Sequence, residues 1–212
     1  MLEYLSSFDP LTLGVLGSLC AGMMTTLGAA PVLAGRIPNE RSRDALLGFA
    51  AGVMLAASFF SLIVPSLEIS EKVYGEGAIP AGIAVAGILL GAGAVALLNK
   101  MLPHEHFFQG REGPQSVSLR RVWLFIIAIT IHNFPEGLAV GVGFGSGDVS
   151  QGLPLAIGIG LQNAPEGLAV AVALMGEGYS KQRAFMIAAL TGLVEPVGGL
   201  IGAGAVSFSE PL

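Results

Sequence analysis

Two copies of one nine-residue pattern decide the fold of this chain. Residues 132–140 read HNFPEGLAV, residues 162–170 read QNAPEGLAV, and each copy lies inside an otherwise apolar run. A charged side chain near the centre of a bilayer costs about 2.5 to 3.5 kcal/mol on insertion scales, so a carboxylate there faces a polar interior and has a partner. Glu136 and Glu166 therefore predict two membrane helices that share a polar site, and we expect the partner to be a metal ion.

The composition agrees with a membrane protein. Hydrophobic residues make up 53% of the 212 residues and charged residues 12%, whereas a soluble domain has about a quarter charged residues. The apolar blocks are each close to the roughly 20 residues that cross a hydrocarbon core. We predict an all-α, polytopic transmembrane helical bundle that forms a single domain over residues 1–212. Its six spans are residues 11–33, 45–67, 79–101, 122–145, 153–175 and 184–207.

Basic residues gather on one side of this bundle. Nine of the ten lie in or beside the first, third and fifth connections: Arg36, Arg41, Arg43, Lys100, Arg111, Arg120, Arg121, Lys181 and Arg183. The positive-inside rule makes that side cytoplasmic. We therefore expect a multi-pass protein of the cell (inner) membrane with its N-terminus outside and with residues 102–121 as a cytoplasmic loop. The net charge of -5 predicts no nucleic-acid partner.

Spans four to six carry polar side chains at similar positions along their lengths. The set comprises His132, Asn133, Glu136, Gln162, Asn163, Glu166 and Glu195. His132 and Glu136 are four residues apart, so a helix places them on one face, and the same spacing relates Gln162 to Glu166. Nitrogen and oxygen ligands without a thiolate suit Zn²⁺, Fe²⁺, Mn²⁺ or Cd²⁺. We therefore expect a divalent metal site in spans four to six.

Each of these three helices also carries a proline beside its glutamate, at Pro135, Pro165 and Pro196. A proline lacks the N–H donor, frees the carbonyl four residues earlier and tends to kink its helix. Irregular backbone is tolerated at membrane depth where it lines a cavity. Gly137 and Gly167 leave room for a neighbouring helix or an ion. A single proline-glutamate pair is also compatible with a simple kink and a protonated glutamate, but its repetition favours the site.

Five other polar or sulfur-bearing residues have a plainer interpretation. Met54 and Ser61, in span two, are by default packing residues. His104 and His106 flank a carboxylate in the third connection and are able to hold a divalent cation weakly, although solvated loop residues usually do not. Glu68 belongs to an acidic external loop, which either attracts cations or is simply solvated.

The doubled motif, together with Glu195 and Pro196, resembles the paired signature of the ZIP family of divalent metal transporters, and is most similar to its bacterial, GufA-like branch. The resemblance covers essentially the whole chain. It implies a binuclear site in the middle of the membrane. In the family, one metal is lined by the positions of His132, Glu136, Gln162, Glu166 and Glu195 with Met54 beside them, and the second by those of Asn133 and Asn163 with the glutamates shared.

The same resemblance implies a weaker second metal site, because Asn163 stands where the branch can have an aspartate. Ser61 and Glu68 match positions on the outer side of the family's pathway. The family has eight spans in inverted repeats, of which this chain carries six. We therefore expect spans seven and eight to be absent from the chain or supplied by another one.

These observations predict a transporter that moves divalent metal cations, Zn²⁺ foremost, into the cytoplasm. The metal ion is its substrate, and we expect no organic cofactor and no enzymatic activity. The expected partners are the metal ion, the lipid bilayer and a second copy of the chain. Two alternatives remain open: a metal-binding fragment that does not transport, and an intramembrane metal-dependent hydrolase, for which the sequence lacks a His-Glu-x-x-His run.

Overall fold

The computed structural model describes residues 5–101, 104–106, 110–112 and 121–209. The chain forms two compact units. One unit combines Met1–Ala57 with His132–Leu212, and the other is Ser58–Ile131. The candidate metal site lies in the first unit, and the two units are described separately below.

The six predicted membrane spans are confirmed: the described residues contain six helices long and apolar enough to cross a bilayer. The helical elements are α2 (Pro10–Ala29), η1 (Ala30–Val32), α3 (Glu40–Ser58), η2 (Phe59–Ile63), α4 (Val64–Tyr74), α5 (Ala78–Met101), α6 (Arg121–Gly145), α7 (Val149–Gly176), α8 (Lys181–Gly192) and α9 (Glu195–Ser209). Four of the described helices begin with a side-chain cap, from Asp9 on α2, Asn39 on α3, Asp148 on α7 and Ser180 on α8.

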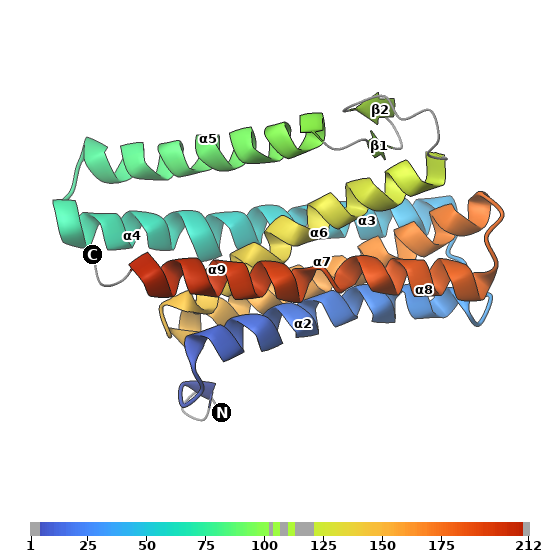
Figure 1. Cartoon of the computed structure of the whole chain (residues 1–212), viewed down its shortest axis with the longest axis horizontal. Helices are drawn as coiled ribbons and strands as arrows, with labels where there is room; N and C mark the ends of the chain where they lie inside the picture. Colours follow the sequence, from blue (N-terminus) through green and yellow to red (C-terminus); the bar gives the residue numbers. More distant parts are fainter. Residues whose placement is uncertain (1–4, 102–103, 107–109, 113–120, 210–212) are drawn as a thin grey trace. The chain divides into compact units, whose positions relative to one another are not determined.

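Within the first unit, helix α2 packs against α7, α8 and α9 (Figure 1). Small residues make this packing possible. A methyl group built on Gly22 of α2 would overlap the carbonyl oxygen of Gly192 in α8, and one built on Gly28 would overlap that of Ala164 in α7. Small residues let membrane helices bring their backbones together, so α2 lies directly against the helices that carry the second motif and Glu195.

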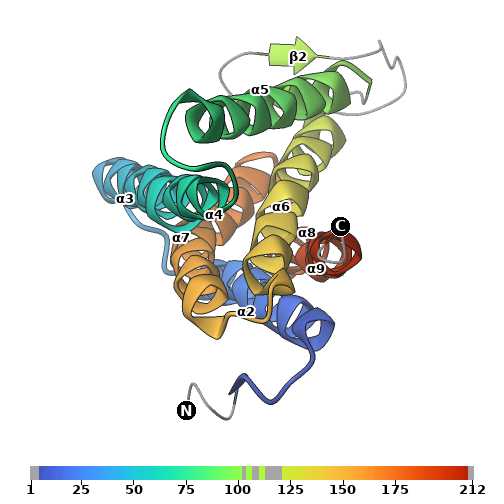
Figure 2. The same ribbon diagram turned by 90° about the vertical axis from the view of Figure 1, so that its left-hand side faces the viewer.

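The contact between α6 and α9 follows the same principle (Figure 2). Gly137 and Gly141 are one turn apart on α6, and methyl groups there would overlap the carbonyl oxygens of Glu195 and Gly199 in α9. On α9, a methyl group at Gly202 would overlap the carbonyl of Leu138. At these glycines, α6 and α9 therefore pack backbone against backbone.

The sixth span is interrupted near its middle. Helix α8 ends at Gly192, and α9 begins at Glu195. Pro196 cannot donate a hydrogen bond to the Gly192 carbonyl, and this carbonyl faces Gly22 of α2 instead. The predicted kink is a two-residue interruption of the helix at Leu193 and Val194, and it puts Glu195 in the first turn of α9.

The second span is longer than the predicted residues 45–67. It forms a 35-residue helix over Glu40–Tyr74. The prediction followed only the apolar residues, but polar residues prolong the helix at both ends, so Glu68 lies on α4 and not in a loop. The segment η2 is a π-helical turn in which the Val64 N–H donates to the Phe59 carbonyl, five residues earlier. Ser61 lies in this turn, and π-helical turns are frequent at functional sites.

In the second unit, α4 packs against α5. The sequence predicts a loop for the third connection. In the structure this connection contains a short antiparallel hairpin of β1 (His104–His106) and β2 (Gly110–Glu112), with His104 opposite Glu112. A hairpin in a connection leaves the all-α membrane architecture unchanged.

The glycine contacts lead to a stability prediction. Gly141→Ala places a methyl group on the backbone of α9, and we expect it to lower the free energy of unfolding by about 1 to 3 kcal/mol, the usual cost of overpacking. The matched control is Gly93→Ala in α5, where an added Cβ would meet nothing within 4 Å. Alanine is the better helix former by about 1 kcal/mol, so the control should be neutral or slightly stabilising. Thermal unfolding in detergent compares the two, and equal midpoints would contradict the proposed packing.

Candidate metal centre

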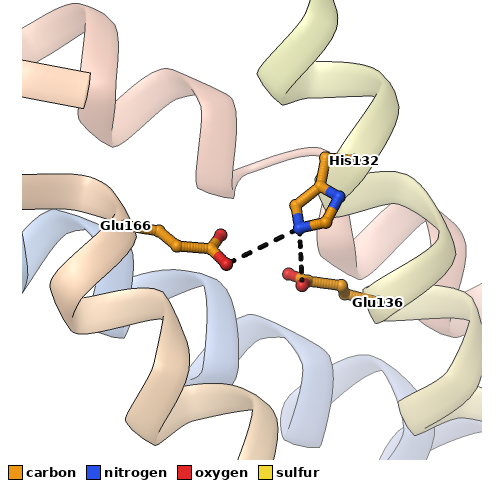
Figure 3. Close-up of side chains that lie close together, drawn as sticks. All are labelled: His132, Glu136 and Glu166. Atoms are coloured by element: carbon orange, nitrogen blue, oxygen red, sulfur yellow. Dashed lines mark ion pairs between the residues drawn. The ribbon is translucent and has the colours of Figure 1, made fainter. Parts of the chain in front are cut away.

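Three side chains from two helices converge in the first unit (Figure 3). His132 and Glu136 come from α6, and Glu166 comes from α7. The His132 Nε2 atom lies 3.4 Å from the Glu136 Oε1 atom and 3.5 Å from the Glu166 Oε1 atom. One ligand atom from each of the three residues lies within 4.8 Å of the other two. The helical spacing predicted for His132 and Glu136 is therefore present, and the second motif brings its glutamate to the same point.

These distances suit a divalent transition metal. Two ligand atoms bound to a tetrahedral ion at about 2.1 Å lie about 3.4 Å apart, close to both separations from His132. The His132 side chain is 45% exposed, whereas the two carboxylates are mostly buried, with 9% of the Glu136 side chain and 15% of the Glu166 side chain exposed.

Amide side chains donate hydrogen bonds to two of the carboxylates, those of Glu136 and Glu195. Gln162 of α7 donates a hydrogen bond from Nε2 to the Glu136 Oε1 atom, which joins the two copies of the motif. Gln162 is completely buried, and Asn133 is 1% exposed. Neither Gln162 Oε1 nor Asn133 Oδ1 has a hydrogen-bond partner among the described residues. Both oxygens thus remain available to a ligand.

Asn163 of α7 donates hydrogen bonds to two other helices, α2 and α9. Its Nδ2 group donates to the Ala21 carbonyl of α2 at 2.9 Å and to the Glu195 Oε1 atom of α9 at 2.7 Å. Because a carbonyl can only accept, the amide nitrogen must face Ala21, and the Oδ1 atom points elsewhere. Asn163 and Glu195 are both completely buried, so the orientation of the Glu195 carboxylate depends on this amide.

The cluster has more acceptors than donors. The buried oxygens without a partner among the described residues include Asn133 Oδ1, Glu136 Oε2, Gln162 Oε1, Asn163 Oδ1 and Glu195 Oε2. A buried polar atom left unsatisfied costs about 1 to 3 kcal/mol. A cation with its bound water supplies what these oxygens lack, and the donor set fits a hydrated divalent ion.

The structure does not bring every predicted residue into this cluster. Met54 is half-buried in α3, and the hydrogen bonds and ion pairs of the site, as far as the described residues show them, do not include it. Ser61 and Glu68 belong to the second unit, in η2 and α4. The side chains of His104 and His106 lie outside the part of the chain whose side chains are described. The roles of these five residues remain predictions.

The sequence alone predicts no site residue in α2. The Ala21 carbonyl nevertheless receives the amide of Asn163, and the Glu195 Oε1 atom lies close to Gly22, where an added Cβ would be 3.3 Å away. No local signal in the first span reveals this role, because alanine and glycine are ordinary residues in a membrane helix.

Comparisons with known proteins agree on one family. The family described as ZIP Zinc transporter matches residues 109–211. Zinc transporter ZIPB of Bordetella bronchiseptica is 46% identical over 193 residues, which cover 91% of this chain but 62% of that protein. Zinc transporter GufA of Myxococcus xanthus is 42% identical over 199 residues, with 94% of this chain and 78% of that protein covered. Human zinc transporter ZIP11 is 36% identical over 279 residues, with coverages of 93% and 82%.

The bonds of Asn163 lead to a second prediction. In Asn163→Asp, the new carboxylate cannot donate to Ala21 and lies against Glu195. We expect the metal-free protein to lose about 2 to 4 kcal/mol of unfolding free energy, the scale of two buried hydrogen bonds. Added Zn²⁺ should then raise the unfolding midpoint more than in the wild type, and the number of bound ions should move towards two.

The control for this change is Asn39→Asp. Asn39 accepts a hydrogen bond from the Ser42 N–H through its Oδ1 atom, and aspartate caps a helix equally well. Unfolding followed with and without Zn²⁺, together with elemental analysis, makes the comparison. An Asn163→Asp protein that behaves like Asn39→Asp would show that Asn163 does not hold Glu195.

Proposed function

Because this chain belongs to the ZIP family of zinc transporters, we propose that it carries Zn²⁺, or another divalent transition metal, across the cell membrane into the cytoplasm. The observation that supports this most directly is the spacing of His132, Glu136 and Glu166, which matches the ligands of one ion within helices of membrane-spanning length. The relatives are named as transporters. This argues against the intramembrane hydrolase.

In this proposal His132, Glu136 and Glu166 bind the metal directly. Further oxygen ligands come from Asn133, Gln162, Asn163 and Glu195, with Met54 beside the site. The unpartnered oxygens of the four additional residues support the assignment. The hydrogen bond between Asn163 and Glu195 uses the Nδ2 and Oε1 atoms, and it leaves Asn163 Oδ1 and Glu195 Oε2 for a second ion. The proposed site is binuclear, with a weaker second position because Asn163 is uncharged.

The transport step exchanges water for protein ligands. The hydrated ion loses part of its water to imidazole and carboxylate groups, and its charge compensates the glutamates in a medium of low dielectric constant. The orientation proposed from the basic residues has the ion pass Ser61 and Glu68 on the outer side and His104 and His106 on the cytoplasmic side. Protons replace the ion on the carboxylates after its release.

The bilayer and a second copy of the chain are the proposed macromolecular partners. In α5, Leu89 and Leu90 are 66% and 74% exposed. Side chains of this size and polarity are covered in a membrane by lipid or by another helix. We propose the inner membrane as the location, with the N-terminus outside.

Removing one carboxylate tests the metal site. Glu166→Ala should lower the affinity for Zn²⁺ by more than about 100-fold, because even residues that only support a ligand change metal affinity by about 10- to 100-fold. The control Glu177→Ala removes an exposed carboxylate at the end of the same helix and should leave the affinity unchanged. Isothermal titration in detergent measures binding, and a zinc-sensitive dye inside vesicles measures uptake. Similar affinities of the two variants would refute the site, and binding without uptake would favour the non-transporting alternative.

The affinity should also depend on pH. Zinc binds deprotonated carboxylates and neutral imidazole, so protons compete for His132, Glu136 and Glu166. We expect the affinity to fall steadily as the pH is lowered from about 8 to about 5, in coupled steps that belong to the cluster rather than to a single residue. Titrations across this range check it. An affinity independent of pH would mean that these groups do not bind the ion.

A further inference from the structure

The buried hydroxyl group of Thr25 differs from those of Ser18 and Thr191 in its hydrogen bonding. Ser18 and Thr191 are buried, and each donates to a carbonyl of its own helix: Ser18 to Gly14 at 2.6 Å and Thr191 to Ala188 at 2.8 Å. Thr25 of α2 is 1% exposed, yet its Oγ1 atom has no partner among the described residues. A buried hydroxyl without a partner is costly and calls for an explanation.

The explanation begins with Asn163. A threonine inside a helix commonly donates to the carbonyl four residues earlier, which for Thr25 is the carbonyl of Ala21. That carbonyl accepts the Asn163 amide and, as part of the α-helix, the backbone N–H of Thr25, so both of its lone pairs are used. The hydroxyl of Thr25 is therefore left for another partner by the same bond that orients Asn163.

The position of Thr25 restricts what this partner can be. The Thr25 carbonyl lies against Gly167, one turn after Asn163 on α7, and a Cβ built on Gly192 would lie 3.1 Å from the Thr25 Cβ, three residues before Glu195. Side chains on a helix lean towards its N-terminus, which directs the hydroxyl towards the turn of Ala21, where the Asn163 amide is bound. Thr25 thus lies between α7, which carries Asn163, and the last residue of α8, three residues before Glu195.

We propose that the Thr25 hydroxyl is a further oxygen of the cation site, and that it binds the divalent ion, or a water on that ion, beside Asn163 and Glu195. Three unpartnered buried oxygens, on Thr25, Asn163 and Glu195, come from three different helices. A hydrated cation provides both the positive charge and the hydrogen-bond donors that they lack. The inference rests on the proposed function and adds the first span to the ion pathway.

The test replaces Thr25 with valine, which has the same shape and no hydroxyl, and with serine, which keeps the hydroxyl. Thr25→Val should lower the affinity for Zn²⁺ about five- to tenfold, the scale of one hydrogen bond, and should slow uptake into vesicles. Thr25→Ser should stay within about twofold of the wild type. Thr191→Val removes a buried hydroxyl that is bonded to its own helix, and it should retain wild-type affinity.

The thermal stability of the zinc-free protein distinguishes a metal-binding role of Thr25 from a structural role. Because Thr25→Val replaces an unsatisfied hydroxyl with a methyl group, the zinc-free protein should unfold at the same temperature as the wild type or higher. Thr25→Ala should show the same loss of affinity, which guards against a folding defect of the valine variant. Wild-type affinity in both variants, or a lower zinc-free midpoint with unchanged affinity, would overturn the inference. If the wild type and Glu166→Ala both fail to bind Zn²⁺, the proposed function fails as well.

Discussion

Three glutamates lie in apolar helices of membrane-spanning length and have too few positively charged partners. The rest of the structure depends on this constraint. Glu136, Glu166 and Glu195 are surrounded by amides and by one imidazole, and no lysine or arginine joins them in the ion pairs of the described residues. Buried charges of one sign are unfavourable unless a counter-charge is present. We propose that a divalent cation supplies this counter-charge.

Such a site works only if its oxygens are held in place, and glycine-mediated packing achieves this. The glycine of each motif copy admits the backbone of a neighbouring helix: the Glu195 carbonyl at Gly137 and the Thr25 carbonyl at Gly167. The room that these glycines leave is therefore filled by a helix, not by an ion. As a result, α2, α6, α7 and α9 are fixed at the level of the carboxylates, and the glutamate beside each glycine keeps its position.

Much of the fold and the outer part of the site could be predicted from the sequence. Long apolar blocks predict the spans, the four-residue spacing joins His132 to Glu136, and the repeated motif brings in Glu166. These are local patterns, with periods set by the helix. The role of α2 was missed because the bond between Asn163 and the Ala21 carbonyl links residues 142 positions apart, and it involves a backbone atom that every residue has. The extension of the second span to Tyr74 was missed because hydropathy detects the apolar core of a helix and not its polar ends.

The break between α8 and α9 has an electrostatic consequence. A helix carries roughly half a positive charge at its N-terminus and half a negative charge at its C-terminus, and here both ends lie inside one membrane span, on either side of Leu193 and Val194. Glu195 lies in the first turn of α9, where the positive end stabilises a negative charge without any basic side chain. The negative end of α8 adds to the attraction for a cation nearby. An unbroken sixth helix would have moved both partial charges to the membrane surfaces, where water would screen them.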